Sequence, residues 1–156
     1  MDHIKTILTA IDFSHYTQKT LEFAATMARQ MSAKLVVINV INQRDVNIMN
    51  YTFSHMDSLR DKMSIDGWMQ DVKKERTEAF EKAKADLGLG DVSHEFKLRV
   101  GFPFEELMKS VREEKVDLVV MGAKGKSDLA DFLVGSVANK MFRKCPVPIV
   151  SVRIDV

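Results

Sequence analysis

The order in which two kinds of hydrophobic pattern follow one another constrains the fold of this chain more than any other feature. Short apolar or β-branched runs, typical of strands, alternate with longer segments that carry apolar residues at helical spacing. The strand-like runs are 4–11, 34–40, 94–100, 117–121 and 147–152, and the helical segments are 16–31, 68–87, 102–115 and 136–144. This alternation predicts an α/β fold with an open, five-stranded parallel sheet, helices on both faces and right-handed crossovers.

Details of three runs indicate where their strands lie in the predicted sheet. The run 34–40 is almost continuously apolar, as expected for a strand that helices cover on both faces. The run 94–100 alternates between polar and apolar residues, which is typical of a strand near an edge. Pro148 has no N–H to donate, so the last strand is also expected at an edge.

A ligand site is expected at the carboxyl ends of these strands. In open parallel sheets, ligands bind outside the carboxyl ends at the point where the strand order reverses. Asp12 directly follows the first run and Gly122 directly follows the fourth. If these two strands are neighbours, Asp12 and Gly122 face each other across one crevice.

The segment 42–66 fits no simple element. A connection of this length without regular structure is usually functional or partly disordered. Because it follows the second strand, it is interpreted either as a lid over the crevice or as a mobile surface insertion.

The stretch 120–127, VMGAKGKS, ends like a phosphate-binding P-loop but has the wrong spacing. A P-loop requires a glycine, four residues and then Gly-Lys-Ser or Gly-Lys-Thr, whereas position 120 holds Val120. The glycines here follow a different pattern, Gly-x2-Gly-x9-Gly-Ser, formed by Gly122, Gly125, Gly135 and Ser136. The P-loop interpretation is therefore rejected.

The residues of this glycine pattern are physically suited to bind phosphate. A glycine lets a phosphate approach the backbone, and the helix predicted from Ser136 offers unpaired N–H groups and a positive dipole end. The hydroxyl of Ser136 would either cap that helix or donate to a phosphate oxygen. Each glycine alone would indicate a turn, but both glycine sites together, beside Asp12, favour phosphate binding.

The composition excludes several classes of function. The 156 residues carry a net charge of +1, which gives no basic field for nucleic acid, and no apolar run approaches the roughly 18 residues of a membrane span. Cys145 is the one cysteine, and the first residues lead into a strand-like run without a signal-peptide cleavage pattern. One domain, 1–156, in the reducing cytoplasm is expected. The four histidines lack the spacing of zinc ligands, and the charged run 73–82 is interpreted as a solvated helix face.

Four stretches together resemble the ATP-binding type of universal stress protein. They are ILTAIDFS (7–14), LVVINVI (35–41), RVGFPFEEL (99–107) and the segment 117–152, which contains the complete glycine pattern. The resemblance covers the chain except 42–66, which is variable in that family. It implies a Rossmann-like fold of the adenine nucleotide alpha hydrolase type with strand order 3-2-1-4-5. It also implies ATP or AMP in the crevice and a role in stress response.

The resemblance also implies roles for individual residues. Asp12, preceded by Ala10 and Ile11, corresponds to the acidic residue at the adenosine. Val40 corresponds to the residue whose backbone reads the adenine edge. The remaining roles are to line the ribose (Met121, Gly122) and to hold the phosphates (Gly125, Gly135, Ser136, Val137, with Lys124 or Lys126). The family often dimerises through its last strand, so the resemblance also implies a homodimer through 147–152, and an unpaired strand edge is a ready pairing site.

Asp128 leaves the choice between ATP and AMP open. A carboxylate near the expected phosphates would repel a triphosphate or hold a divalent cation such as Mg²⁺. Alternatively, Asp128 lies in the first turn of a helix capped by Ser127 and has no ligand role.

Two other functions remain open on the sequence. One is a nucleotide-independent stress protein that acts as a dimeric interaction module, although such proteins usually lack the glycine pattern that this chain keeps. The other is an adenylating or ATP-pyrophosphatase enzyme, which would be expected to show a Ser-Gly-Gly-x-Asp-Ser loop or a His-x-Gly-His pair. The turn after the first run reads AIDFSHYT instead. Because no residue is identified as a general base, any ATP hydrolysis is expected to be slow.

Overall fold

A single parallel sheet organises the molecule. The computed structural model describes residues 3–60, 63–123 and 135–153. Within these residues, five strands pair in the order β3-β2-β1-β4-β5, which confirms the predicted topology. The strands are β1 (Thr6–Ala10), β2 (Lys34–Asn42), β3 (His94–Gly101), β4 (Leu118–Gly122) and β5 (Ile149–Val152). The predictions that the third and fifth strands lie at or near the edges are also confirmed.

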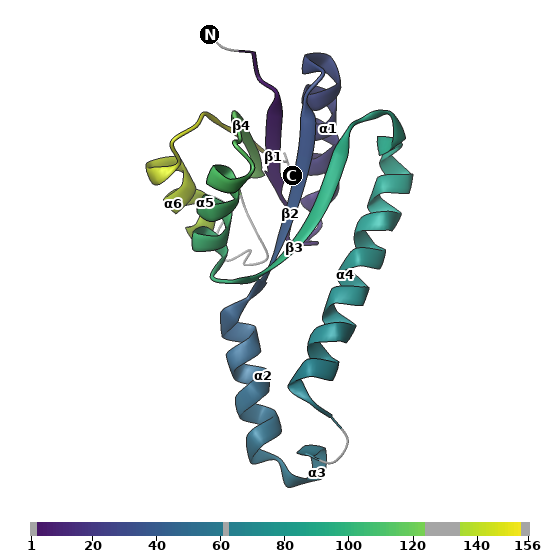
Figure 1. Cartoon of the computed structure of the whole chain (residues 1–156), viewed down its shortest axis with the longest axis vertical. Helices are drawn as coiled ribbons and strands as arrows, with labels where there is room; N and C mark the ends of the chain where they lie inside the picture. The colour runs from purple at the N-terminus through teal and green to yellow at the C-terminus, as the bar shows by residue number, and fades with distance from the viewer. Residues whose placement is uncertain (1–2, 61–62, 124–134, 154–156) are drawn as a thin grey trace.

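Helices cover both faces of this sheet (Figure 1). On one face lie α1 (Thr17–Met31) and α4 (Ile65–Leu87), and on the other lie α5 (Pro103–Glu113) and α6 (Ser136–Lys144). The observed bounds are within about three residues of the predicted ones. α5 begins at Pro103, where a missing N–H costs little. α4 ends at Leu87, and its C-cap Gly88 adopts the left-handed conformation with φ of 60°.

The core consists of two layers because successive strand residues point to opposite faces. Ile7, Leu35 and Val37 pack under α1 and α4, together with Phe80 of α4. The residues between them along the strands pack under α5 and α6, as Val36 does. Each such buried side chain stabilises the fold by about 1.5–3 kcal/mol. The central strands are therefore held rigidly, and their carboxyl ends are fixed in space.

The interpretation of 42–66 as a segment without regular structure is wrong. It contains α2 (Gln43–His55) and α3 (Asp57–Arg60), and α4 begins within it at Ile65. Asn42 caps α2 by accepting a hydrogen bond from the Arg44 N–H at 3.1 Å. α2 and the first half of α4 extend away from the sheet (Figure 1). The helical pattern was hidden because α2 buries only Phe53 among its residues, so its apolar stripe is short.

None of the helices within the described residues is both long enough and apolar enough to cross a membrane.

Candidate functional site

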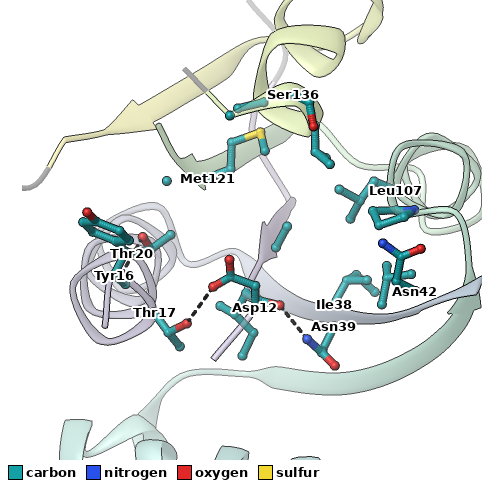
Figure 2. A pocket seen from close by; sticks show the side chains of 18 of the residues that line it. Asp12, Tyr16, Thr17, Thr20, Ile38, Asn39, Asn42, Leu107, Met121 and Ser136 are labelled. Atoms are coloured by element: carbon teal, nitrogen blue, oxygen red, sulfur yellow. Dashed lines mark hydrogen bonds between the residues drawn. The ribbon is translucent and has the colours of Figure 1, made fainter. Parts of the chain in front are cut away.

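The crevice expected at the carboxyl ends of the strands is present. β1 and β4 are adjacent, with Ala10 paired to Met121, and Asp12 and Gly122 both line one cavity. The cavity has a volume of about 350 Å³ and opens between α1, α5 and α6 (Figure 2). Its lining comes from the ends of β1, β2 and β4, the turn after β1 and the start of α6, with further residues from α1, α2, α4 and α5.

Most of the residues singled out from the sequence line this cavity. They are Ala10, Ile11, Asp12, Val40, Met121, Gly122, Gly135, Ser136 and Val137. Lys124, Gly125 and Lys126 lie outside the described residues, as do Ser127 and Asp128. The structure therefore brings Asp12 and the start of α6 to one cavity, while the roles expected for these residues, and for Lys124, Gly125 and Lys126, stay predictions.

Asp12 lies in the turn between β1 and α1. Its Oδ1 accepts a hydrogen bond from the Ser14 N–H at 3.0 Å and one from the Thr17 hydroxyl at 3.5 Å. Phe13, between these residues, has a φ of 58°, which is uncommon for a side chain of this size. Both bonds end on Oδ1, so they leave the lone pairs of Oδ2 for another donor. Half-buried and facing the cavity, this carboxylate is suited to accept hydrogen bonds from hydroxyl groups.

The start of α6 forms the other side of the cavity. Gly135 is its N-cap, and the Gly135 N–H donates to the Ala123 carbonyl at 3.0 Å, which ties the helix start to the end of β4. Ser136 is the first helical residue, and no side chain caps α6. The option that Ser136 caps this helix is therefore wrong, because Gly135 holds that position. Ser136 and Val137 line the cavity, so the Ser136 hydroxyl and the first N–H groups of α6 are suited to bind an anion there.

A buried amide and a guanidinium, neither of which was expected at the site, complete the cavity beside β2. Asn39 is 2% exposed; its Nδ2 donates to the Ile11 carbonyl at 2.8 Å, and its Oδ1 accepts from Arg76 Nη1 at 2.7 Å. Arg76 Nη1 also donates to the Val40 carbonyl at 3.2 Å. The interpretation of 73–82 as a solvated face is thus wrong at Arg76, which turns inward and lines the cavity.

A sequence signal existed for Asn39 but not for Arg76. Asn39 interrupts an apolar run, and a polar residue within a buried strand needs a hydrogen-bonding partner. Arg76 stands among lysines and glutamates that give no sign of which side chain turns inward. The other lining residues that were missed come mainly from α1, α5 and the first turn of α2: Tyr16, Thr17, Thr20, Ile38, Asn42, Asp45, Pro103, Leu107 and Ala138.

The charges in the described part of the cavity are few. Asp12 and Asp45 supply carboxylates, and Arg76 supplies the cation. Burial lowers the pKa of the Arg76 guanidinium, and the carboxylates of Asp45 and Glu75 partly offset this effect. No group of three potential metal-ligating side chains occurs among residues 3–60, 63–123 and 135–153.

Comparisons with known proteins agree on one family. A sequence model of the Universal stress protein family matches residues 3–153. Universal stress protein MJ0577 of Methanocaldococcus jannaschii is 26% identical over 153 residues, with 96% of this chain and 94% of that protein covered. Universal stress protein YxiE of Bacillus subtilis is 29% identical over 152 residues, with 94% and 97% covered.

Solved structures have the same fold. MJ0577 superposes with a TM-score of 0.80 at 22% identity, and the match covers 99% of each chain. A universal stress protein in complex with cAMP superposes with a TM-score of 0.62 at 25% identity, with 97% of this chain and 98% of that one covered.

Proposed function

The chain belongs to the universal stress protein family, and from this premise we propose that it binds an adenine nucleotide in the cavity. One observation carries the proposal: a single cavity joins the end of β2, the Asp12 carboxylate and the start of α6. The backbone at the end of β2 can hydrogen-bond to the edge of a base, and the Asp12 carboxylate can accept hydrogen bonds from ribose hydroxyls. The start of α6 can bind a phosphate.

In the proposed complex the base lies beside Val40, because the backbone there supplies both a donor and an acceptor. The ribose lies between Asp12 and Met121, with its hydroxyls donating to the carboxylate. The phosphates lie at Gly135 and Ser136, at the positive end of α6. The cAMP complex of a protein 25% identical to this one supports a purine nucleotide as the class of ligand. ATP and AMP are both kept as candidates, with Mg²⁺ accompanying ATP.

We assign the nucleotide a regulatory role. Within the described part of the cavity the charged side chains are Asp12, Asp45 and Arg76. Asp12 is engaged by Ser14 and Thr17 on the ribose side, away from the proposed phosphates, and is poorly located to activate water there. The bound nucleotide then acts by stabilising the conformation that binds it. The proposed molecule is a cytoplasmic homodimer that acts in stress response.

Isothermal titration calorimetry tests the proposal. Protein stripped of copurified nucleotide is titrated with ATP, ADP and AMP, with and without Mg²⁺, and saturable binding of at least one of them is expected. Asp12→Ala is expected to weaken that binding by about tenfold, since it removes a charged acceptor worth roughly 1.5 kcal/mol. Asp71→Asn, on the exposed face of α4, is the matched control.

The same titration separates this proposal from its alternatives. The absence of heat with all three nucleotides from folded protein would leave the nucleotide-independent interaction module as the better account. Rapid release of pyrophosphate or phosphate from ATP would instead favour an enzyme.

A further inference from the structure

The end of β2 extends beyond its neighbour β1. Pairing between the two strands ends at Ala10 opposite Ile38, and one further backbone bond follows, from the Ile11 N–H to the Ile38 carbonyl at 3.0 Å. In a parallel ladder the backbone groups of successive residues point alternately to the two sides of the strand. The N–H and C=O of Val40 therefore point to the same side as those of Ile38. A regular continuation of the ladder would bring the Val40 N–H to the Ile11 carbonyl.

A side chain bonds to this carbonyl instead. Asn39 Nδ2 donates to the Ile11 carbonyl at 2.8 Å, and among the described residues no backbone hydrogen bond joins Val40 to Ile11. Ile11 is 5% exposed, so its carbonyl needs a partner within the protein, and the amide supplies it. Because Val40 lines the cavity, its N–H is left for an acceptor on a ligand.

A guanidinium holds the Asn39 amide in this orientation. Arg76 Nη1 donates to Asn39 Oδ1 at 2.7 Å, so the oxygen and the nitrogen of the amide both have partners. A flipped amide would set its NH2 group against the guanidinium and its oxygen against the Ile11 carbonyl. Since Asn39 is 2% exposed, water cannot compensate for such a flip, and the buried amide is a rigid support for the backbone it bonds.

The Val40 carbonyl also remains usable by a ligand. Arg76 Nη1 donates to it at 3.2 Å, but a carbonyl oxygen has two lone pairs and can accept a second hydrogen bond. In the proposed complex an adenine can therefore donate its amine to this oxygen while its N1 accepts from the Val40 N–H. The second of these bonds depends on keeping the Ile11 carbonyl away from that N–H.

We propose that Asn39 is a positioning residue for the base: by binding the Ile11 carbonyl, its amide leaves the Val40 N–H to N1 of the adenine. This inference rests on the proposed function, because it concerns the base of the same nucleotide. Without the amide, the Ile11 carbonyl would recover a partner by closing on the Val40 N–H, as in a regular ladder. In this role Asn39 acts through Val40 rather than by contact with the ligand.

The test compares ATP and AMP with their 1-deaza analogues, in which a C–H group replaces N1 of the base. Affinities are measured calorimetrically for the wild type and for two variants that remove the donor in different ways. Asn39→Asp keeps an acceptor for Arg76, whereas Asn39→Leu keeps the volume of the side chain without burying a second charge. Asn50→Asp, at an exposed position of α2, is the matched control.

The wild type and the control are expected to bind the natural nucleotides about tenfold more tightly than the analogues, because the analogues lack one hydrogen bond. In both Asn39 variants this preference is expected to disappear: the affinity for ATP and AMP falls about tenfold, while the affinity for the analogues changes little. Circular dichroism checks that each variant is folded. A purely structural role would weaken the natural nucleotides and the analogues alike and leave their ratio unchanged.

A wild-type ratio in folded Asn39→Asp and Asn39→Leu would overturn the role given to Asn39 while leaving nucleotide binding intact. The same holds for a wild type that binds ATP or AMP without distinguishing it from its analogue, since the Val40 N–H would then have no part in binding the base. If folded wild-type protein binds neither ATP nor AMP, the proposed function fails, and the role of Asn39 fails with it.

Discussion

Gly135 gives the clearest test of the phosphate site at the level of a single residue. Its φ of −55° and ψ of 152° are accessible to any L-residue, so a side chain here causes little backbone strain. Gly135→Val adds bulk at the start of α6, where the proposed phosphates lie. We expect ATP affinity to fall at least tenfold, with the melting temperature lowered by only a few degrees, as for the loss of a favoured N-cap residue. Calorimetry and thermal denaturation measure the two effects.

Gly135→Ala is the graded control for this prediction, since its single methyl group should reduce affinity less than the valine does. A folded Gly135→Val variant with wild-type ATP affinity would remove Gly135 from the site.

Some residues of the site could be predicted from the sequence and others could not. Asp12 and Gly122 were placed correctly because each follows a strand, and the strand order alone brings those positions together. Arg76 was missed because its contact with Asn39 joins residues 37 positions apart. That contact depends on how α4 docks against the sheet, and its neighbours in the sequence are equally charged. Local pattern carries no information about which of these charges turns inward.

Asp117, which precedes β4, connects two elements of the sheet. Its Oδ2 accepts hydrogen bonds from the N–H groups of Lys5 and Thr6 at 2.8 and 2.9 Å. These bonds hold the pKa of the carboxyl below its ordinary value of 3.8. A lowered pKa means that the stabilisation is complete above about pH 4 and is lost as the pH falls through the folded-state value.

Asp117→Asn is therefore expected to lower the free energy of unfolding by about 1 kcal/mol at pH 7, because solvent screens this partly exposed carboxylate. The difference from the wild type should shrink below pH 3.8, because a protonated aspartate resembles asparagine. Chemical denaturation between pH 3 and pH 7 measures this, with Asp71→Asn as control. A difference that stays constant over the whole range would contradict the role given to the charge.

The helices and strands that bury the most apolar surface were the ones that the sequence predicted best. The central strands and α1 carry long apolar patterns because their apolar side chains pack against one another in the core. α2 was missed because it extends from the sheet and rests on few apolar contacts, with Ile48 and Tyr51 exposed. Its existence depends on capping by Asn42 and on helix propensity, which are weaker signals than periodicity.

Among the described residues the outer edge of β5 pairs with no other strand, and this edge predicts how two copies would pair. Ala123 donates to the Val152 carbonyl and Val119 donates to the Pro148 carbonyl, so those carbonyls point toward β4. By alternation, Ile149 and Ser151 direct their backbone groups outward. Ser151→Pro removes an outward N–H without affecting the bonds to β4, and edge strands tolerate proline.

We expect the wild type to be a dimer and Ser151→Pro to be a folded monomer, as measured by analytical ultracentrifugation and circular dichroism. Ser151→Thr, which keeps the N–H, should remain dimeric. A Ser151→Pro variant that is still dimeric would place the interface elsewhere.

The two edges of the sheet differ chemically, and this difference limits how far such pairing continues. Arg99 of β3 forms ion pairs with Glu106 and Glu113, Lys97 pairs with Glu114, and charged side chains on an edge strand discourage the addition of another strand. The four residues of β5 carry no charge. A filament built by extending sheets needs two receptive edges in every copy, whereas the described part of this chain offers one. Growth through β5 would therefore stop at a closed, twofold-symmetric pair, even in a crowded cell.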